Sequence, residues 1–396
     1  MTSTRPPQSR EKPSRRKKSG QQSGAMQPGG KQPGTKKTAA KQSAGSQPAT
    51  SESAGPRIRL SRRRMLVLIL VTVIAVAAAG LYAALAFRDA RASQEAPSPV
   101  NATASEALPV TPFVVFRNTA PGQGFGTAAT VPLADPGGQR ALSTMSCDRV
   151  YGTHELTVCL QTKQGLATTF QATVYNSAWK ETASWPLPGI PSRARTNADG
   201  SLLSSTVFVS GHSYAAAGFS TETVIRDRKG QAIANLEDFA LMLDGTRIKA
   251  SDRNIWGVTF APGKPDVFYA TASSQGHIWL VQGSIADRTL TVIGNSIECP
   301  SVSPDGTRIA YKKSDTGTLS GHRSIAVLDL ASGKEMVLSE QQNIDDQIEW
   351  LDSSTLLYGL PRDGSEQDSD IWSIKTDPNA RPTLFIEHAW SPAVVR

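Results

Sequence analysis

The chain has few aromatic residues, cysteines and histidines, and its first 64 positions contain almost no acidic residues. Aromatic side chains make up 6% of the 396 residues, and there are 3 cysteines and 5 histidines. We find no phosphate-binding glycine loop, no zinc-ligand spacing and no carboxylate pair that the sequence brings together. Without a convergent catalytic set, we expect no enzyme activity and no cofactor.

Positive charge is concentrated at the N-terminus. Residues 1–64 contain 16 Lys and Arg against two acids, Glu11 and Glu52, a net charge of +14. Subtraction from the totals of 42 and 34 leaves 26 basic and 32 acidic residues, or −6, for the remainder. The high pI therefore belongs to this tail, and we expect no nucleic-acid partner.

The tail is rich in Ser, Gly, Gln, Pro and Lys and cannot bury enough apolar surface to offset the entropy cost of ordering its backbone. This composition predicts a disordered basic segment over residues 1–64. Two interpretations stay open. Either the tail is solvated and its charge only sets membrane topology, or its basic runs contact anionic lipid head groups.

An apolar segment follows the tail. Residues 65–87 contain no charge across 23 positions, and at about 1.5 Å each they reach roughly 34 Å, enough for a hydrocarbon core of about 30 Å. Five arginines lie between positions 57 and 64, whereas Arg88, Asp89 and Arg91 nearly cancel after the segment. The positive-inside rule then predicts a single-pass transmembrane helix with a cytoplasmic N-terminus and an extracytoplasmic C-terminal region.

A cleaved secretory signal is the alternative interpretation of this segment. Small residues at positions 84 and 86, and again at 90 and 92, would suit a signal peptidase, and Ser61–Leu66 loosely resembles a twin-arginine motif. The long leader and the long apolar stretch favour an uncleaved anchor instead. Residues 88–111 are rich in Pro, Ala and Ser and are predicted to be a flexible linker of roughly 25–30 Å.

A four-strand unit repeats in the C-terminal region. Its clearest copy contains predicted strands at 297–302, 307–313, 325–330 and 335–339, with the turn Ser303-Pro304-Asp305-Gly306 after the first strand. Equivalent turns recur about every 40–50 residues, which is the spacing of propeller blades. Since one unit cannot cover its own faces, neighbouring units must stack around an axis.

The two ends of the repeat region complete each other. Residues 389–395 have the pattern of a first strand, and the predicted strands 113–117, 127–133 and 140–143 supply the other three, which closes the ring and removes its open edge. The other blades are predicted at 144–188, 190–239, 254–295, 297–342 and 347–388, with 240–253 as an insertion. The prediction is an all-β, six-bladed propeller over residues 112–396.

These repeats resemble a known family. The segments Ser303–Tyr311, Leu328–Lys334 and Asp370–Trp372 are similar to repeats of TolB-like (WD40-like β) propellers. The resemblance covers 112–396 and is clearer over 255–395. It implies a six-bladed propeller outside the cytoplasmic membrane of a bacterium. Together with the apolar segment 65–87, this predicts a single-pass protein of the bacterial cell membrane. Membership of the Tol-Pal system is not expected, because a membrane anchor takes the place of the TolB N-terminal α/β domain.

Two of the three cysteines are placed to pair. Cys147 and Cys159 lie six residues on either side of Thr153, which would set them opposite each other on an antiparallel hairpin. Disulfides persist outside the cytoplasm, so we predict this bond, with two buried thiols as the open alternative. Cys299 is expected to be a free, packed thiol.

Three further motifs resemble catalytic or metal-binding motifs only loosely. Gly211–Ala215 approaches a nucleophile elbow but lacks the second glycine and the strand–turn–helix context. His277 and His322 both follow glycine at one blade position, and equivalent positions on neighbouring blades are too far apart for one metal ion. The loop Asp363–Asp370 is acidic, yet it lacks the spacing of a calcium loop. Coincidence or turn chemistry is favoured for each.

The remaining candidates lie on the first strands, which line the central channel of a propeller. They are Trp256, Glu298, Glu349, Trp350, His388 and Trp390. Such an amphipathic, aromatic set suits a peptide or a sugar, although strand alternation should bury about half of it against the next blade. We predict that one end of the channel binds an extended segment of a partner.

The sequence is compatible with three functions. The leading hypothesis is a membrane-anchored binding or scaffold protein of the cell envelope that binds a protein, a peptide or a wall polymer. The alternative is an envelope enzyme of the lactonase or sugar dehydrogenase type, with a metal or quinone cofactor. A ring of inward His, Asp and Glu would favour the enzyme, and an aromatic channel without metal the binding protein. A role of the basic tail in signalling is the weakest idea.

Overall fold

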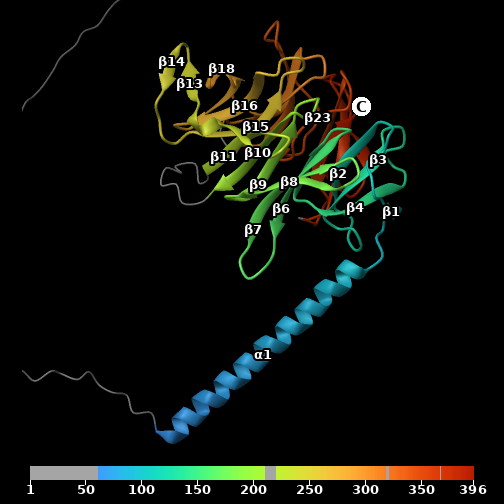
Figure 1. Ribbon diagram of the computed structural model, residues 1–396, viewed down its shortest axis with the longest axis vertical. Helices are drawn as coiled ribbons and strands as arrows, with labels where there is room; N and C mark the ends of the chain where they lie inside the picture. The colour runs from blue at the N-terminus through green and yellow to red at the C-terminus, as the bar shows by residue number, and fades with distance from the viewer. Residues whose placement is uncertain (1–60, 210–219, 318–320, 366) are drawn as a thin grey trace, which may run out of the picture. The chain divides into compact units, whose positions relative to one another are not determined.

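A computed structural model of the chain describes residues 61–209, 220–317, 321–365 and 367–396. Helix α1 runs from Arg62 to Glu95 (Figure 1). Its stretch Arg62–Asp89 is the one helix among the described residues that is long and apolar enough to cross a membrane. Its large apolar side chains are exposed to the surroundings, as a lipid-facing helix requires. Residues 1–60 of the predicted tail and the Gly211–Ala215 motif lie outside the described residues. The predicted disorder is wrong for Arg62–Arg64, which already belong to helix α1.

Each of five blades is an antiparallel sheet of four consecutive strands, innermost strand first. Blade 1 consists of β5 (Arg149–Gly152), β6 (Leu156–Lys163), β7 (Thr169–Asn176) and β8 (Glu181–Leu187). Blade 2 consists of β9 (Ile190–Thr196), β10 (Leu202–Val209), β11 (Ser220–Asp227) and β12 (Ala232–Asn235). Blade 3 consists of β15 (Asn254–Phe260), β16 (Val267–Ser274), β17 (His277–Ser284) and β18 (Thr289–Asn295). Blade 4 consists of β19 (Ile297–Val302), β20 (Arg308–Ser314), β21 (Arg323–Asp329) and β22 (Glu335–Val337). Blade 5 consists of β23 (Glu349–Trp350), β24 (Thr355–Pro361), β25 (Ser369–Lys375) and β26 (Thr383–Ile386).

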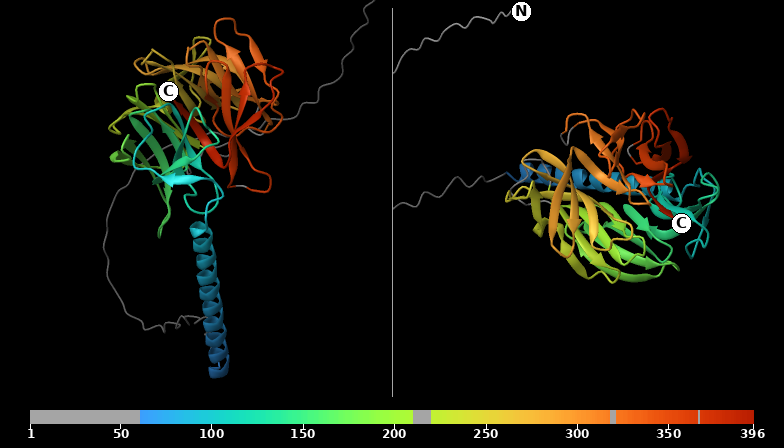
Figure 2. Two further views of the ribbon diagram at one scale, coloured as in Figure 1. Left: turned by 90° about the vertical axis from the view of Figure 1, so that its right-hand side faces the viewer. Right: turned by 90° about the horizontal axis from the view of Figure 1, so that it is seen from above.

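The sixth blade joins the two ends of the repeat region. Its innermost strand is β27 (Ala389–Val395), which pairs with β2 (Phe113–Asn118), followed by β3 (Thr127–Pro132) and β4 (Arg140–Ser146). Phe113 lies opposite Val395, so the last strand of the chain is held by the first strand of the repeat region. The red end of the chain accordingly lies beside the cyan strands (Figure 2). The predicted six-bladed propeller and its shared closing blade are confirmed.

Six apolar clusters hold the blades together, one at each junction between neighbouring blades. Alternation along β2 shows how one strand serves two junctions. Phe113 and Val115 pack towards blade 1, while Val114 and Phe116 pack towards blade 5. Each such buried side chain contributes roughly 1.5–3 kcal/mol, so the ring is stabilised by stacking on both faces of every sheet.

A bulge recurs in three innermost strands. The register shifts in β15, β19 and β27 at residues with positive φ, namely Gly257 (65°), Cys299 (49°) and Ser391 (58°). A Cβ on Gly257 would lie 2.7 Å from the Cα of Cys299, so this position requires glycine. The bulges bend the strands beside the channel and change which side chains point into it.

The turn Ser303–Gly306 after β19 has the chemistry that its sequence predicts. The Asp305 carboxylate accepts hydrogen bonds from the Ser303 hydroxyl (2.5 Å) and the Thr307 amide (3.0 Å), and Gly306 has a φ of 72°. The bond from Ser303 is the largest influence lowering the pKa of Asp305, to about 2. The Asp305 carboxylate therefore stays charged at neutral pH, and its hydrogen bonds fix where β19 ends at the channel.

The segment predicted as a flexible linker is partly ordered. Helix α1 continues past residue 87 to Glu95, and β1 (Ala102–Ala104) pairs in parallel with β4, with Ala102 opposite Arg140. The predicted coil over 88–111 is therefore wrong for these two stretches. Strand β4 is the outer edge of its blade, and β1 satisfies backbone groups that the edge would leave unpaired.

The insertion before blade 3 forms a hairpin. Strands β13 (Ala240–Leu243) and β14 (Thr246–Ile248) follow the short 3₁₀ helix η1 (Leu236–Asp238), and β13 pairs in parallel with β18. The sheet of blade 3 thus has six strands, with the inserted pair on its outer side, away from the channel.

A disulfide bond joins Cys147 and Cys159, whose Cα atoms are 5.4 Å apart. The predicted hairpin geometry behind this pair is nevertheless wrong. Strand β5 begins only at Arg149, and Val150, not Cys147, lies opposite Cys159. Cys147 belongs to the connection from β4, so the bond ties blade 6 to the second strand of blade 1. Cys299 is a buried free thiol.

Candidate functional site

A cavity of about 620 Å³ opens where the innermost strands of all six blades end. We call it the turn-side cavity. Its lining comes, blade by blade, from Tyr151–His154, Arg195–Asp199, Thr259–Pro265, Ser301–Pro304, Glu349–Trp350 and Val394–Arg396. Each of these segments is the last part of an innermost strand or the turn that follows it, so the cavity is one mouth of the central channel.

The floor of the turn-side cavity is a buried ion pair. Arg195 Nη1 bonds Glu349 Oε2, and their side chains are only 8% and 7% exposed. Tyr151 Oη donates to Glu349 Oε1 at 3.2 Å, and Arg195 Nη2 donates to the Ile348 carbonyl at 2.7 Å. These contacts join blades 1, 2 and 5 at the base of the cavity.

Burial and Glu349 raise the pKa of Tyr151 to about 12. Burial acts to lower the pKa of Arg195, but Glu349 and Tyr151 outweigh it and raise that pKa. Both groups stay protonated at neutral pH. The floor is thus a fixed element, because the charged groups of Arg195 and Glu349 bond each other.

One wall of the cavity is formed by Trp350, which is 2% exposed. Its Nε1 donates to the Ser301 carbonyl at 2.8 Å, and the Arg308 guanidinium lies 5.3 Å from the centre of its ring. The indole therefore holds blade 5 against blade 4 and exposes very little of its surface. Its role as a wall is better supported than a role as a free aromatic platform.

Of the six channel candidates, only Glu349 and Trp350 line the turn-side cavity. Glu298 is buried in β19 and pairs with Arg323 Nε at 3.1 Å. Trp256 is buried in β15, and Trp390 in β27 is half-buried, with the Arg149 guanidinium 6.0 Å from its ring centre. The six residues thus do not converge on one site, because bulges and neighbouring blades divide them.

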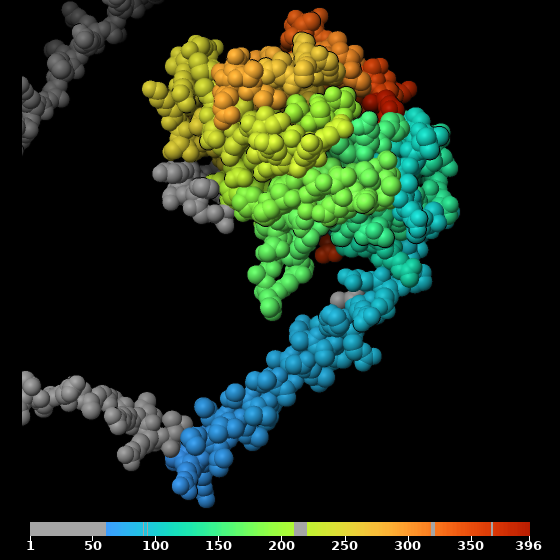
Figure 3. Space-filling view, in the orientation of Figure 1, coloured from blue at the N-terminus to red at the C-terminus, as the bar shows by residue number. Residues whose placement is uncertain are grey.

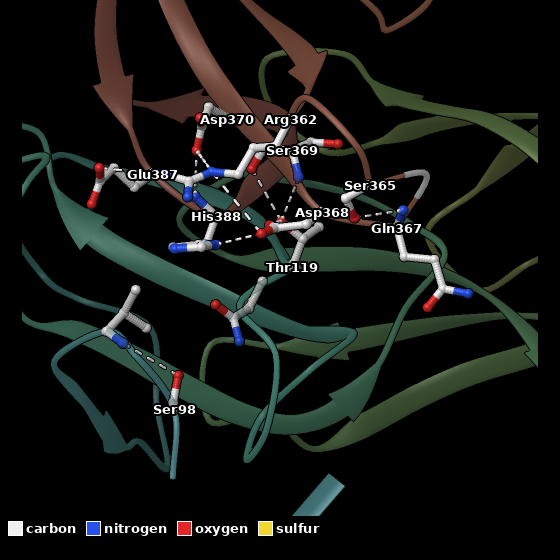
Figure 4. A network of polar contacts seen from close by, with 12 residues as sticks. Ser98, Thr119, Arg362, Ser365, Gln367, Asp368, Ser369, Asp370, Glu387 and His388 are labelled. Atoms are coloured by element: carbon white, nitrogen blue, oxygen red, sulfur yellow. Dashed lines mark hydrogen bonds and ion pairs between the residues drawn. The ribbon is translucent and has the colours of Figure 1, made fainter. Parts of the chain in front are cut away.

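His388 lies just before β27, in a polar network between blades 5 and 6 (Figure 4). Its Nδ1 is 2.7 Å from Asp368 Oδ2, and Arg362 Nε is 2.8 Å from Asp370 Oδ1. Thr119 Oγ1 donates to Asp368 Oδ1 at 2.9 Å. The described carboxylates at the end of the acidic loop therefore bond groups of the protein itself.

No three His, Cys, Asp or Glu side chains among the described residues come together in a way that could hold a metal ion. The imidazole of His277 stacks on Trp279 with ring centres 5.5 Å apart. His322 Nε2 is 3.0 Å from the Gln341 carbonyl oxygen. Each histidine thus has a local partner within its own blade or the loop that follows it.

Three arginines of the channel are not among the predicted site residues. Arg193 and Arg195 alternate along β9 and Arg149 begins β5, and all three are on innermost strands. Arg149 and Arg193 lie away from the cavity, towards the end of the channel where the innermost strands begin, which we call the start side. The signal was present in Ser192-Arg193-Ala194-Arg195, since period-two alternation on a first strand predicts two arginines on one face.

No family model and no curated protein sequence matches the chain. Among solved structures, it is similar to TolB from Acinetobacter baumannii, with a TM-score of 0.51 and 15% identity over 72% of this chain and 66% of that one. A structure assigned to TolB of Agrobacterium tumefaciens matches with a TM-score of 0.42 and 8% identity, covering 70% and 89% of the two chains. A Bacteroides caccae protein of unknown function matches with a TM-score of 0.43 and 11% identity, covering 72% and 99%. The chain thus spans just under two thirds of the Acinetobacter protein, and at such identities the likeness concerns the fold. The fold of this chain is that of a TolB-like six-bladed β-propeller.

Proposed function

We propose that the chain is a membrane-anchored binding protein of the bacterial cell envelope. Its turn-side cavity takes an extended segment of a partner protein or peptide. The observation that carries this proposal is the cavity of about 620 Å³ to which all six blades contribute. That volume lies within the range of ligand sites, roughly 300–1,000 Å³, and accommodates several side chains of a bound segment.

The chemistry of the cavity suits recognition. Its rim consists of exposed turn residues such as Ala198, Lys264 and Pro304, which a partner reaches without rearrangement of the core. Thr153 and Thr259 also line the cavity. Their hydroxyl oxygens accept hydrogen bonds from the Leu156 amide (3.3 Å) and the Val302 amide (3.2 Å), so their O–H groups are suited to donate to backbone carbonyls of an extended segment. The floor is held rigid by its own ion pair, so its side chains lose little conformational entropy when a partner binds.

The anchor in this proposal is helix α1, with residues 65–87 in the bilayer and the propeller, residues 112–396, outside the cytoplasm. The flanking charges support that orientation, because five arginines precede the apolar stretch. The basic residues 1–64 then lie in the cytoplasm, where contact with anionic lipid is compatible with their charge of +14.

The test uses the full-length chain in detergent with the native envelope fraction, and compares a substitution at the rim with one elsewhere. Ala198→Arg fills the mouth of the cavity from an exposed turn. Gln164→Arg adds the same charge to the β6–β7 hairpin, which projects from the surface (Figure 3). We expect stoichiometric capture of one envelope component by wild type and Gln164→Arg, and a loss of about tenfold or more in Ala198→Arg.

Equal capture by both variants would show that the turn-side cavity is not the site. Metal content is measured on the same samples by mass spectrometry. One bound metal ion per chain with no captured component would contradict the binding proposal and favour the enzyme alternative of the lactonase or sugar dehydrogenase type. Capture of a wall polymer instead of a protein would contradict the proposed protein or peptide partner, while the cavity would still be the binding site.

A further inference from the structure

Two buried cations meet on one backbone oxygen at the start side of the channel. Arg193 Nη2 donates to the Asp345 carbonyl at 2.6 Å, and Lys312 Nζ donates to the same oxygen at 3.0 Å. The two charged nitrogens are therefore within about 6 Å of each other. A single carbonyl dipole neutralises neither charge, so two like charges face each other in a poorly solvated place.

The carboxylate of Asp345 itself lies close to Lys312. Its Oδ1 is 3.7 Å from Lys312 Nζ, which is longer than a hydrogen bond, and its side chain is 72% exposed. The Lys312 side chain is 3% exposed and Arg193 is 9% exposed. The Asp345 carboxylate thus lies beside the buried Lys312 ammonium group without a hydrogen bond to it, and most of its surface is exposed.

Two more cations act on the Asp345 charge, Arg149 and Arg323. Arg323 is paired with Glu298 at 3.1 Å. Arg149 Nε donates to the Ser192 carbonyl at 2.7 Å, and burial followed by the nearby Arg193 lowers the pKa of Arg149 to about 10. Glu298 compensates the charge of Arg323. Among the residues that the structure describes, the other three cations, Arg149, Arg193 and Lys312, have only the carboxylates of Asp345 and Asp346 nearby to compensate them.

Several polar atoms in this region have no protein partner. Asp346 is fully buried and accepts a hydrogen bond from the Ser391 amide at 2.9 Å through Oδ2 only. Within the described part of the chain, Arg193 Nε, Asp346 Oδ1 and Ser391 Oγ are buried without a hydrogen-bond partner. Unpaired buried donors are costly, and a ligand with oxygen atoms would satisfy those of Arg193 and Ser391.

We propose that these residues form an oxyanion-binding site at the start-side mouth of the channel, which takes a carboxylate or phosphate group of a ligand. We call it the Asp345 cluster, made of Arg149, Arg193, Lys312, Arg323, Asp345 and Asp346. In the absence of a ligand, the exposed Asp345 carboxylate lies near the cations, and a ligand oxyanion that binds them displaces it. Guanidinium groups suit this role because their planar N–H fork matches carboxylate and phosphate oxygens.

The site is separate from the proposed partner cavity, which is built on the opposite ends of the innermost strands. The test uses the full-length chain in detergent, titrated with sodium phosphate or sodium acetate at constant ionic strength against chloride. Calorimetry measures the affinity, and the thermal midpoint is followed on the same samples. The variants are Asp345→Asn, Asp345→Asn with Arg193→Gln, and the control Asp363→Asn, which neutralises another exposed acid.

We expect Asp345→Asn to bind one of the two anions about tenfold more tightly than wild type, because a competing internal charge is gone. Adding Arg193→Gln should remove that gain, and Asp363→Asn should behave as wild type. The anion that binds more tightly identifies the ligand as a phosphate or a carboxylate. Equal affinity in Asp345→Asn and Asp363→Asn, or a gain that survives Arg193→Gln, would overturn the proposal. Capture of a partner at the turn-side cavity is scored separately and is unaffected by either result.

Discussion

At the turn side of the channel, Arg195 and Glu349 bond each other directly, whereas at the start side Arg193 and Lys312 share one backbone oxygen. Both pairs are buried, and both are built from strands of different blades. The first is charge-compensated by a buried partner, and the second depends on an exposed carboxylate. One end of the channel is therefore complete without a ligand, and the other retains unpaired groups.

This difference has consequences for stability. A paired buried charge becomes costly when its partner is lost, whereas a buried charge in a crowded, like-charged cluster is costly already. The two ends should consequently respond in opposite ways when one member of the Arg195–Glu349 pair or of the Arg193–Lys312 pair is removed. Three measurements test that contrast, from the largest expected effect to the smallest.

The largest effect is expected for Glu349→Leu at the floor of the turn-side cavity. It leaves the Arg195 guanidinium buried opposite an apolar side chain, which should lower the unfolding free energy by about 3–5 kcal/mol. Urea unfolding of the full-length chain in detergent measures the change. The double variant with Arg195→Met should recover most of the loss, since no buried charge then lacks a partner. A loss below about 1 kcal/mol would mean that the pair is as weak as a surface pair.

A smaller effect, of opposite tendency, is expected for Lys312→Met at the start side. The substitution removes one of two cations bound to the Asp345 carbonyl and leaves that oxygen paired with Arg193. The unfolding free energy should stay within about 1 kcal/mol of wild type or rise, because the lost desolvation cost offsets the lost contact. A decrease as large as that of Glu349→Leu would remove the contrast between the two ends.

The smallest effect concerns pH. Burial acts to raise the pKa of Asp345, but Lys312, Arg193, Arg149 and Arg323 outweigh it and hold that pKa below its ordinary value. An acid with a lowered pKa in the folded state contributes stability above its unfolded value of about 3.9, and loses it as the pH falls through the folded value.

Asp345→Asn should therefore be less stable than wild type at pH 7, by at most about 1 kcal/mol because the side chain is largely exposed. The difference between the two unfolding free energies should shrink as the pH falls below about 4. Urea midpoints measured at pH 7 and at pH 3 in chloride buffer give the comparison. A gap that is constant across this range would show that the carboxylate does not interact with the cluster.

The propeller itself was predictable because its information is local and repeated. Ser303–Gly306 specifies a turn wherever its chemistry recurs, and alternation in segments such as Phe113–Phe116 specifies two buried faces. The closing blade was also predictable. The start of the repeat region has three strands and lacks an innermost one, and residues 389–395 have the pattern of that missing strand. The prediction of a coil was wrong for the end of α1 and for Ala102–Ala104, because composition does not reveal that an edge strand nearby has unpaired backbone groups.

The candidate site was less predictable. Of the six predicted channel residues, Glu349 and Trp350 line the turn-side cavity, while Glu298 pairs with Arg323 and His388 bonds Asp368. Which side chain enters the channel depends on bulges at positions such as Cys299 and on the neighbouring blade. A bulge shifts the alternation of side chains by one residue, and the sequence of one strand does not predict where the bulge occurs.

The sequence by itself determined the apolar span, the four-strand repeat, the number of blades and the way the ring closes. Each of these depends on patterns within one segment or on counting copies. Only the tertiary structure decided that Arg195 pairs with Glu349, 154 residues away, and that Arg193 and Lys312 meet at Asp345. Such contacts join different blades, and their geometry follows from the stacking of sheets around an axis, which no local pattern encodes.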